Sequence, residues 1–573
     1  MREFEPSETE LAQQRAWTSS ARPLISVVTP VYNTPLPILR ATIESVISQT
    51  YAHWELCLVD GASTLPGVGE LLTEVAAAEP RIRIKTLDHN RGIAGNTTEA
   101  VRMATGEYAL FLDHDDTLAP NALFEVARAI LDDPQVDIIY FDEDKLTADG
   151  RRRLDPFFKP DWSPEMLLSA NYLMHAVLRR DVFAQVGGFD PAAEGTQDWD
   201  LMLRCTERTQ AIRHIPKVLY HWRMMPGSTA AEFTAKPYVF ENQLRCVANH
   251  LQRQGVREAQ ASFPRLGVLR VSWPTRHPQV SIIIPTKDNV KLVRPCLDSI
   301  RTRTSYHQFE IILVDTGSRD RDTLAYYDEL AGDERVRIVQ YTKPFNYSAA
   351  NNFGAQHATG DLVLFLNNDI EVLEPDWLEE LVRWAERPEI GIVGAKLLYP
   401  SGLIQHAGVV IGMEGHASHI FWGSREDTGG IFGSVEWYRN YLAVTGACMI
   451  MRRQVFDEIG GFDEDYQLVF SDVEICLRAV EKGYRNVYCP FARLTHHEGG
   501  SRGQRMPPAD LVRGYGHMRR LVEAGDPSFN PNLSYASRIP VLARKAEERR
   551  LDRLSRMSGM PEGSGAALAD RRA

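Results

Sequence analysis

Three carboxylates stand within four positions in the segment FLDHDD, at Asp113, Asp115 and Asp116, directly after an apolar run. Such a cluster is costly unless a cation neutralises part of its charge. Oxygen ligands suit Mg²⁺ or Mn²⁺, and these ions readily share their coordination shell with phosphate groups. The other interpretation is a loop between a strand and a helix, in which Asp116 or Thr117 caps the helix. The segment by itself leaves both interpretations open.

The chain carries its chemical motifs twice and in the same order. FLNNDI repeats FLDHDD about 254 residues later, with Asp369 at the position of Asp115. So long a period excludes a solenoid of short repeats and predicts a duplicated domain of about 200–250 residues. Independent capping residues have no reason to recur in one order, so the recurrence favours function. The other matched positions are Pro30 with Pro285, Asp60 with Asp315, Asp198 with Asp472, and His221 with His496.

Each matched residue type also has a structural interpretation. Asp60 and Asp315 end apolar runs, where a carboxylate can bind a base or ribose, or can close an Asx-turn. Asp198 and Asp472 stand at the start of predicted helices. An acid there can serve as a general base, or it can stabilise the helix by interacting with the positive end of its dipole. A lone histidine is usually structural, but one that recurs after an acidic strand end is a candidate metal ligand.

The elements that must position these residues alternate along the chain. Short runs rich in Val, Ile and Leu alternate with helical stretches such as 36–50 and 121–133. Nearly continuous apolar strands joined by helical crossovers predict an α/β fold, with a mostly parallel sheet covered by helices on both faces. In such sheets ligands bind beyond the carboxyl ends of the strands. The proline and aspartate motifs all stand at that edge.

The repeat also predicts the domain organisation. The second copy has about 20 extra residues, in a distinctive segment around 401–440. The basic stretch 151–159 could face phosphates but is expected to be a solvated turn. We expect a helical leader at 1–22, a first domain at 23–230, a linker at 231–278, a second domain at 279–505, and a helical region with a disordered tail at 506–573.

Composition excludes several classes of protein. The 573 residues carry a net charge of −12 and no long basic block, so a general nucleic-acid binder is disfavoured. No apolar run reaches the length of a membrane span, and the acidic N-terminal stretch does not read as a signal peptide. Seven scattered cysteines without a CxxC pair suit reduced thiols. We therefore expect a cytoplasmic protein.

The ordered motifs resemble the inverting family 2 glycosyltransferases of the GT-A fold. The resemblance covers most of residues 23–505, and the whole chain is similar to the two-module enzymes that build bacterial surface polysaccharides, such as O-antigen or rhamnan-type chains. In the first copy it rests on TPVYN, VDGAS, NRGIAGN, FLDHDD, GGFD, TQDWDLMLR and LYHWR; in the second on IIPTKDN, VDTGS, FNYSAANNFG, FLNNDI, VTGACMIMRR, GGFDEDY, FSDVEICLRA and THHEGGSRG.

The resemblance implies a role for each matched residue. Asp198 and Asp472 correspond to the base that deprotonates the acceptor hydroxyl. Asp115 with His221, and Asp369 with His496, would hold Mn²⁺ or Mg²⁺ on the donor diphosphate. The residues assigned to the nucleotide sugar are Pro30, Tyr32, Asp60, Asn90, Asp113, Pro285, Asp315 and Asn367.

The sequence departs from the family pattern at three places. Gln197 and Ser471 stand where a glutamate is common, and Asn367 replaces the first aspartate of the D-x-D motif. The implied donor is a UDP-, dTDP- or GDP-sugar, and the implied acceptor is a glycan or a lipid-linked glycan. A positioned carboxylate and a divalent cation together provide for in-line attack by a hydroxyl, with inversion and no covalent intermediate.

Other interpretations remain at this level. One module alone could be catalytic while the other binds the growing glycan, and the second has fewer carboxylates. A nucleotidyltransferase would need a glycine-rich, basic loop, which neither copy has after Pro30 or Pro285. A glycan-binding protein would not need paired metal and base carboxylates. The stretch 541–557 carries six basic residues and could contact the inner face of the cytoplasmic membrane, although a solvated helix is the alternative.

Overall fold

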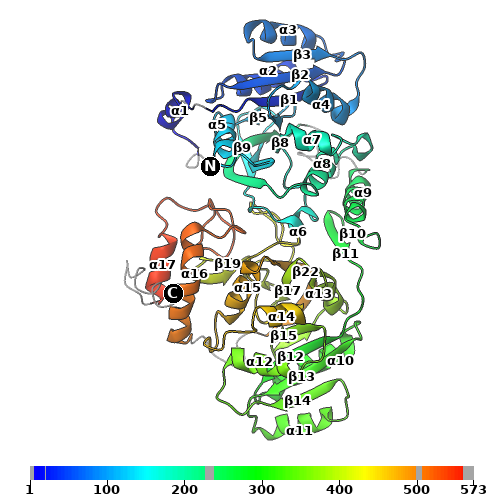
Figure 1. The fold of residues 1–573 in the computed structure, drawn as a ribbon, viewed down its shortest axis with the longest axis vertical. Coiled ribbons are helices and arrows are strands. Elements are labelled where there is room, and N and C mark those ends of the chain that lie inside the picture. The colour runs from blue at the N-terminus through cyan, green and yellow to red at the C-terminus, as the bar shows by residue number, and fades with distance from the viewer. Residues whose placement is uncertain (1–4, 18, 20, 226–237, 498–505, 559–573) are drawn as a thin grey trace. The chain divides into compact units, whose positions relative to one another are not determined.

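The computed structural model describes residues 5–17, 19, 21–225, 238–497 and 506–558. The chain forms two compact units, drawn in Figure 1. The first comprises Met1–Trp162, Ala170–Leu269 and Gly430–Gly433, and the second comprises Ser163–Ser169, Arg270–Gly429 and Ser434–Ala573. The expected linker 231–278 is thus divided: its described residues up to Leu269 count with the first unit and those from Arg270 with the second.

A nine-stranded mixed sheet forms the centre of the first unit. Its order is β3-β2-β1-β4-β8-β6-β9-β5, with β7 paired to β6. The pairs β1–β2, β1–β4, β2–β3 and β6–β9 are parallel, whereas β8, β5 and β7 pair in the antiparallel sense. The strands are β1 (Ile25–Val31), β2 (Trp54–Asp60), β3 (Ile82–Thr86), β4 (Tyr108–Phe111), β5 (Thr117–Leu118), β6 (Ile138–Leu146), β7 (Arg153–Phe157), β8 (Val177–Arg179) and β9 (Ile212–Arg223).

The second unit repeats this order strand for strand. Its nine-stranded sheet runs β14-β13-β12-β15-β21-β17-β22-β16, with β18 paired to β17. Two small sheets, β10–β11 and β19–β20, complete the described strands; β10 belongs to the first unit, and the boundary between the units falls within β11. The strands are β10 (Gln260–Arg265), β11 (Val268–Ser272), β12 (Val280–Thr286), β13 (Phe309–Asp315), β14 (Val336–Gln340), β15 (Leu362–Leu366), β16 (Ile370–Val372), β17 (Ile390–Leu398), β18 (Ile404–His406), β19 (Val409–Ile411), β20 (Ala417–His419), β21 (Cys448–Arg452) and β22 (Arg485–His496).

The predicted duplication and the α/β class are confirmed by this topology. The register is repeated as well, because Pro30 lies opposite Val59 and Pro285 lies opposite Val314. The extra segment of the second copy is not a plain loop, since it contributes β18, β19 and β20. No helix among the described residues combines the length and the apolar character needed to cross a bilayer.

Helices pack on each sheet through apolar stripes. In α5 the residues at 122, 123, 126, 127 and 130, which share one helix face, are buried, and those at 124, 125 and 129 are buried as well. The described helices of the first unit are α1 (Glu8–Arg15), α2 (Leu36–Ile47), α3 (Val68–Ala78), α4 (Gly92–Met103), α5 (Ala122–Asp132), α7 (Arg180–Gln185), α8 (Gln197–Thr206) and α9 (Tyr238–Arg253), with a short 3-10 turn at Pro191–Ala193. The second unit has α6 (Pro164–Leu167), α10 (Val290–Arg303), α11 (Arg321–Leu330), α12 (Tyr347–His357), α13 (Trp377–Ala385), α14 (Arg453–Glu458), α15 (Ser471–Glu481), α16 (Pro508–Ala524) and α17 (Arg550–Ser558).

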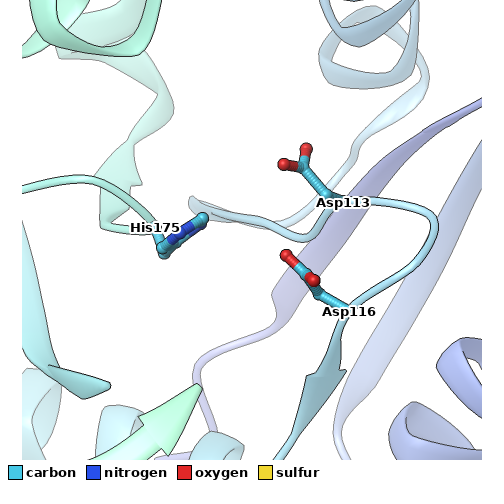
Figure 2. A group of neighbouring side chains, drawn as sticks. All are labelled: Asp113, Asp116 and His175. Atoms are coloured by element: carbon cyan, nitrogen blue, oxygen red, sulfur yellow. The ribbon is translucent and has the colours of Figure 1, made fainter. Parts of the chain in front are cut away.

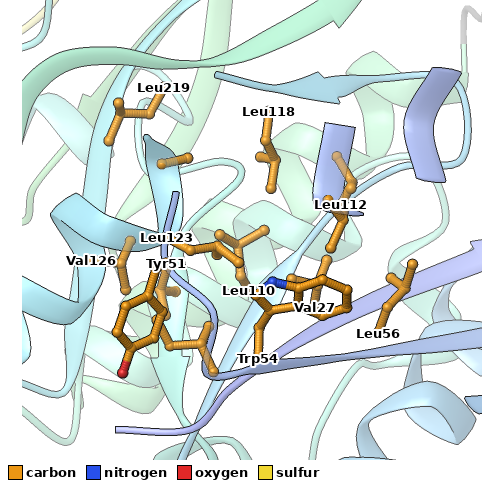
Figure 3. Close-up of a cluster of buried hydrophobic side chains, with 14 of the residues drawn as sticks. Val27, Tyr51, Trp54, Leu56, Leu110, Leu112, Leu118, Leu123, Val126 and Leu219 are labelled. Atoms are coloured by element: carbon orange, nitrogen blue, oxygen red, sulfur yellow. The ribbon is translucent and has the colours of Figure 1, made fainter. Parts of the chain in front are cut away.

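The core of the first unit lies where these helices meet the sheet. Val27, Leu56 and Leu110 come from three adjacent strands and join Leu123 and Val126 of α5, as Figure 3 shows. Each is nearly or fully buried. Burial of one such side chain stabilises the fold by about 1.5–3 kcal/mol. This packing holds the carboxyl ends of β1, β2 and β4 in fixed relation.

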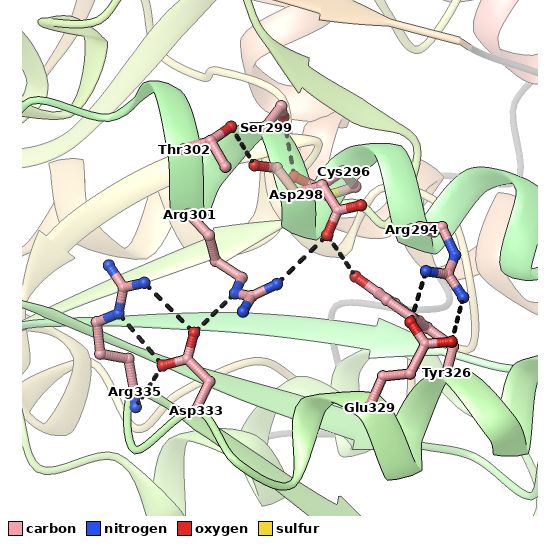
Figure 4. A network of polar contacts seen from close by, with 10 residues as sticks. All are labelled: Arg294, Cys296, Asp298, Ser299, Arg301, Thr302, Tyr326, Glu329, Asp333 and Arg335. Atoms are coloured by element: carbon pink, nitrogen blue, oxygen red, sulfur yellow. Dashed lines mark hydrogen bonds and ion pairs between the residues drawn. The ribbon is translucent and has the colours of Figure 1, made fainter.

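In the second unit a polar network ties the outer helices to the sheet (Figure 4). It joins α10 to α11 and to the turn before β14. The Arg294–Glu329 pair is exposed and the other pairs are part-buried. An exposed ion pair contributes only about 0–1 kcal/mol. The pairs are Arg294 with Glu329, Arg301 with Asp333, Arg335 with Asp333, and Tyr326 with Asp298.

Candidate active sites

The first predicted binding residues lie at the carboxyl ends of parallel strands. Asp60, at the end of β2, is 4% exposed, and its Oδ1 accepts the Ser63 amide at 3.0 Å. In the second unit Oδ1 of Asp315 accepts the Ser318 amide at the same distance. Each carboxylate therefore accepts the backbone amide three residues further on and so fixes the turn at the sheet edge.

Asn90 and Tyr32 flank that edge in the first unit. Oδ1 of Asn90 accepts a bond from Nδ2 of Asn96 at 2.9 Å. A β-carbon placed on Gly61, the residue after Asp60, would lie 3.0 Å from the same oxygen, so Asn90 sits directly beside the Asp60 turn. The Tyr32 ring is 40% exposed. The structure thus brings Asn90 to the turn and leaves Tyr32 facing solvent.

The acidic segment after β4 meets a histidine that the sequence did not single out. Donor atoms of Asp113, Asp116 and His175 all lie within 4.8 Å of one another, and the three side chains converge in Figure 2. His175 has a φ of 60° and stacks on Tyr220 with ring centroids 3.8 Å apart. Its Nε2 is buried and has no hydrogen-bond partner among the described residues. An unpaired imidazole nitrogen beside two carboxylates is a donor set that fits a divalent cation.

Burial and neighbouring negative charge disfavour the ionised form of two carboxylates in this cluster. Burial, followed by the charges of Asp115 and Asp198, raises the pKa of Asp113 to about 7. Burial and the charge of Asp115 also raise the pKa of Asp116 well above its usual range, although Asp116 accepts bonds from the Tyr220 hydroxyl at 2.6 Å and the Arg223 amide at 2.7 Å. A bound cation reverses both shifts, because it favours the ionised carboxylates.

Asp198 lies in the same pocket as the acidic segment. It is the second residue of α8, and its Oδ2 accepts Nδ2 of Asn171 at 2.8 Å. Burial raises the pKa of Asp198, while that bond and backbone amides oppose the rise. A carboxylate with a raised pKa is a better proton acceptor near neutral pH. Pro30, Asp113 and His175 line the pocket with it.

The pocket is small in this conformation. Its volume is about 70 Å³, whereas ligand sites typically measure about 300–1,000 Å³. Ile93 lines it and is 53% exposed. The enclosed part of the pocket is therefore too small to contain a whole ligand the size of a nucleotide.

The second unit brings its predicted residues together at the matching edge. Nε2 of His496 lies 3.2 Å from Oδ1 of Asp369, and Asn367 reaches the same nitrogen at 3.5 Å. Asp472 is the second residue of α15, and its Oδ2 accepts the Gly446 amide at 2.9 Å. An aspartate and a histidine side by side fit a divalent cation, with an asparagine in place of the second acid.

His221 is placed differently from its sequence counterpart. In the first sheet Thr117 lies opposite His221, but in the second Ile370, one position earlier in the motif, lies opposite His496. A one-residue change of register turns a strand side chain to the other face. His221 accordingly bonds Asp144, with Nδ1 2.7 Å from Oδ1. The described cation cluster of the first unit contains neither His221 nor Asp115.

Sequence reasoning missed a buried polar group on β6. Asp142, Glu143 and Asp144 in FDEDKL are all buried, and Lys159 is fully buried with its Nζ 2.9 Å from Glu143. The expectation of a solvated turn at 151–159 is therefore wrong at Lys159, because this ammonium is needed to neutralise buried carboxylates. Three consecutive acids at the end of an apolar strand were the available signal.

Comparison with known proteins decides the family. The family model described as glycosyl transferase family 2 matches residues 26–187 and 281–460, which contain the strand-end motifs of both units. The chain belongs to glycosyltransferase family 2. The resemblance drawn from the motifs is thereby confirmed, and the duplication is a duplication of the family 2 domain.

Two bacterial relatives match nearly the whole chain. It is 44% identical to the O-antigen biosynthesis protein RfbC of Myxococcus xanthus, over 95% of this chain and 43% of the relative. It is also 44% identical to the uncharacterized protein y4gI of Sinorhizobium fredii, over 89% of this chain and 58% of the relative. The chain thus spans about half the length of these relatives. A solved mannosyltransferase of Pyrobaculum calidifontis, in complex with GDP-Man and Mn²⁺, matches with a TM-score of 0.32 at 20% identity, over 45% of this chain and 68% of that one.

Proposed function

We propose that this family 2 chain is a bifunctional inverting glycosyltransferase, in which each module transfers one sugar from a nucleotide sugar to a hydroxyl of a growing glycan. The observation that carries the proposal is the pairing, in both units, of strand-end acids with an aspartate at the second position of a facing helix. Asp113 and Asp198 line one pocket in the first unit. Asp369 and Asp472 stand at the corresponding elements of the second.

In the first module the residues divide the work. Asp198 takes the proton of the acceptor hydroxyl, and Asn171 holds its carboxylate in place. Asp113, Asp116 and His175 would hold Mn²⁺ or Mg²⁺. A divalent cation at this place stabilises the charge that develops on the leaving diphosphate. Asp60 and Asn90 then line the place of the nucleoside.

In the second module Asp472 is the proton acceptor, and Asp369 with His496 would hold the cation. Asn367 would bind a ribose hydroxyl of the donor. Asp315 and Pro285 occupy the positions of Asp60 and Pro30. The two relatives that span the chain are bacterial, and one is named for O-antigen biosynthesis, so we propose a surface glycan, free or lipid-linked, as acceptor.

A second candidate is that only one module is catalytic. It is favoured by the loss of the whole cation cluster between copies. The pairing of β15 with β21 places Cys448 opposite Leu366, at the position that corresponds to His175 in the first copy. The motif of the second copy has Asn367 and Ile370 where the first has Asp113 and Asp116. On this alternative the second unit binds and positions the acceptor.

One assay tests both candidates. The chain is incubated with Mn²⁺ and a panel of UDP-, dTDP- and GDP-sugars on a defined acceptor, and nucleoside diphosphate release is followed. Release that is lost only in the double variant Asp198→Asn with Asp472→Asn supports two active modules. Release that is lost entirely in one single variant and untouched in the other assigns catalysis to one module. Release unaffected by all three variants contradicts the proposal.

A further inference from the structure

The loop that leads to Asp472 is held by a helix outside the expected second domain. Asp510, in the first turn of α16, is fully buried. Its carboxylate accepts three successive backbone amides: Oδ1 accepts Gln467 at 3.0 Å, and Oδ2 accepts Leu468 at 2.8 Å and Val469 at 2.9 Å. Charge-assisted bonds of this kind are stronger than neutral ones, and three of them fix a short stretch of backbone.

The residue after this loop has an uncommon backbone conformation. Phe470 caps α15 with a φ of 65°, a region that a bulky side chain adopts only when its surroundings impose it. Its ring stacks on His416 with centroids 5.0 Å apart. A β-carbon on Gly514 of α16 would lie 3.2 Å from the same ring. Helix α16 therefore packs directly on the residue that starts the base-bearing helix.

A second route of hydrogen bonds runs from the loop to the base. The Gln467 carbonyl accepts the Tyr347 amide at 2.8 Å, and the Tyr347 hydroxyl donates to the Gly446 carbonyl at 2.9 Å. The Gly446 amide in turn donates to Oδ2 of Asp472 at 2.9 Å. Displacement of the loop therefore reaches the carboxylate of Asp472 both along the chain and through Tyr347.

We propose that Asp510 is a positioning residue for the Asp472 base, so that α16 is a working part of the second module. This inference rests on the proposed function of that module. The first module is braced in another way. Helix α9, which also follows the last long strand of its sheet, reaches the loop before α8 through Asn242, whose Nδ2 donates to the Glu194 carbonyl at 2.6 Å. The carboxylate brace is thus a feature of the second copy.

The test uses the full chain carrying Asp198→Asn, so that the remaining turnover belongs to the second module. Asp510→Asn places an amide against backbone donors. We expect kcat to fall about 10–100-fold, as for other small displacements of a catalytic group. Because none of the residues proposed to bind the donor in the second module lies on α16, the KM for the donor should stay within about twofold. Hydrogen exchange at residues 467–469 should become faster.

Two further variants separate positioning from stability. Gly514→Ala places a β-carbon 3.0 Å from the Met518 methyl and 3.2 Å from the Phe470 ring, so it presses on both, while alanine is favoured over glycine in a helix interior by about 1 kcal/mol. We therefore expect kcat to fall with the melting temperature retained. Glu523→Gln makes the same change of charge at an exposed position of α16 and should leave kcat as in the parent.

The outcomes distinguish this inference from the function beneath it. Loss of kcat in both Asp510→Asn and Gly514→Ala, at steady KM, supports it. If Asp510→Asn lowers the melting temperature but the folded enzyme keeps the parental kcat, the carboxylate is only structural and the inference is overturned. If the parent shows no turnover that Asp472→Asn removes, the second module is not catalytic, and the inference falls with it.

Discussion

His496 and Asp369 lie side by side, with Nε2 3.2 Å from Oδ1, at the sheet edge of the second unit. The histidine at the same place in the first copy's motif, His221, bonds Asp144 instead. The two copies therefore present different donor sets to a cation, although their motifs have the same order. The predictions below follow from this difference and from the charges around it.

Removal of His496 should weaken cation binding in the second module. His496→Ala in an Asp198→Asn background deletes one donor nitrogen, so the Mn²⁺ concentration for half-maximal nucleoside diphosphate release should rise at least about tenfold. His221→Ala is the matched control in the Asp472→Asn background. It should instead lower the free energy of unfolding by about 1–3 kcal/mol, because it removes one of the hydrogen bonds of the buried Asp144 carboxylate, which keeps its bond from Nε of Arg153. A large change in Mn²⁺ requirement with His221→Ala would contradict this division.

In the first module the same effect should belong to His175. His175→Ala in an Asp472→Asn background should raise the Mn²⁺ requirement at least about tenfold. Its counterpart Cys448→Ala, tested in the Asp198→Asn background, should change the requirement little, because Cys448 is not part of a described cation cluster. Chelation with EDTA should stop release by both modules, and added Mn²⁺ should restore it. Activity that persists after exhaustive chelation would remove the cation from the proposal.

The metal-free first module should lose stability as pH rises. Asp113 has a pKa of about 7 when folded, against about 3.9 in an unfolded chain. Between these values the folded state binds the additional proton, so the free energy of unfolding falls as pH rises from about 4 to 7. Asp113→Asn should flatten that part of the melting curve. Mn²⁺ competes with the proton, so its stabilising effect should grow toward pH 8.

The two bases should control separate linkages. Asp198→Asn keeps the shape of the side chain but removes the proton acceptor. It should therefore lower the rate of one transfer by about 10²–10⁴-fold and leave the rate of the other unchanged. Asp472→Asn should do the converse. Mixing the two variants should rebuild the full product, measured as glycan mass and linkage on a defined acceptor. A single variant that makes the complete wild-type product would show that its module is not catalytic.

Membrane contact by the C-terminal stretch needs a gentler test than truncation. Helix α17 is docked on the second unit, where the Ser558 hydroxyl lies 2.9 Å from Nε2 of His416, so its removal should disturb the fold. Arg544 and Lys545 are exposed. Replacing both with glutamate should weaken binding to vesicles of anionic lipid by about 1 kcal/mol for each basic residue removed, and less protein should sediment with the vesicles. Equal sedimentation of variant and parent would remove the membrane from the list of partners.

The sequence by itself determined the duplicated α/β organisation and the strands that end in Pro30, Asp60 and their counterparts. These features are local, because an apolar run with a polar end specifies both a buried strand and the edge at which it stops. The positions of Asp198 and Asp472 could also be predicted, since each lies in the first turn of a helix with a clear apolar stripe. The distance between these aspartates and the strand-end acids could not be predicted, because it depends on how the helix packs back on the sheet.

Only the tertiary structure decided which side chains share a site. The cation cluster of the first copy contains His175, which belongs to none of the recurring motifs. A one-residue difference of register turns His221 away from the site, whereas His496 faces Asp369. Such choices depend on ladder register, which no short motif encodes. Asp510 lies 38 positions after Asp472 in the sequence, and its three amide bonds to the 467–469 loop arise only when α16 folds back on that loop. Long-range hydrogen bonds of this kind carry no local signal, because their partners are backbone groups common to every residue.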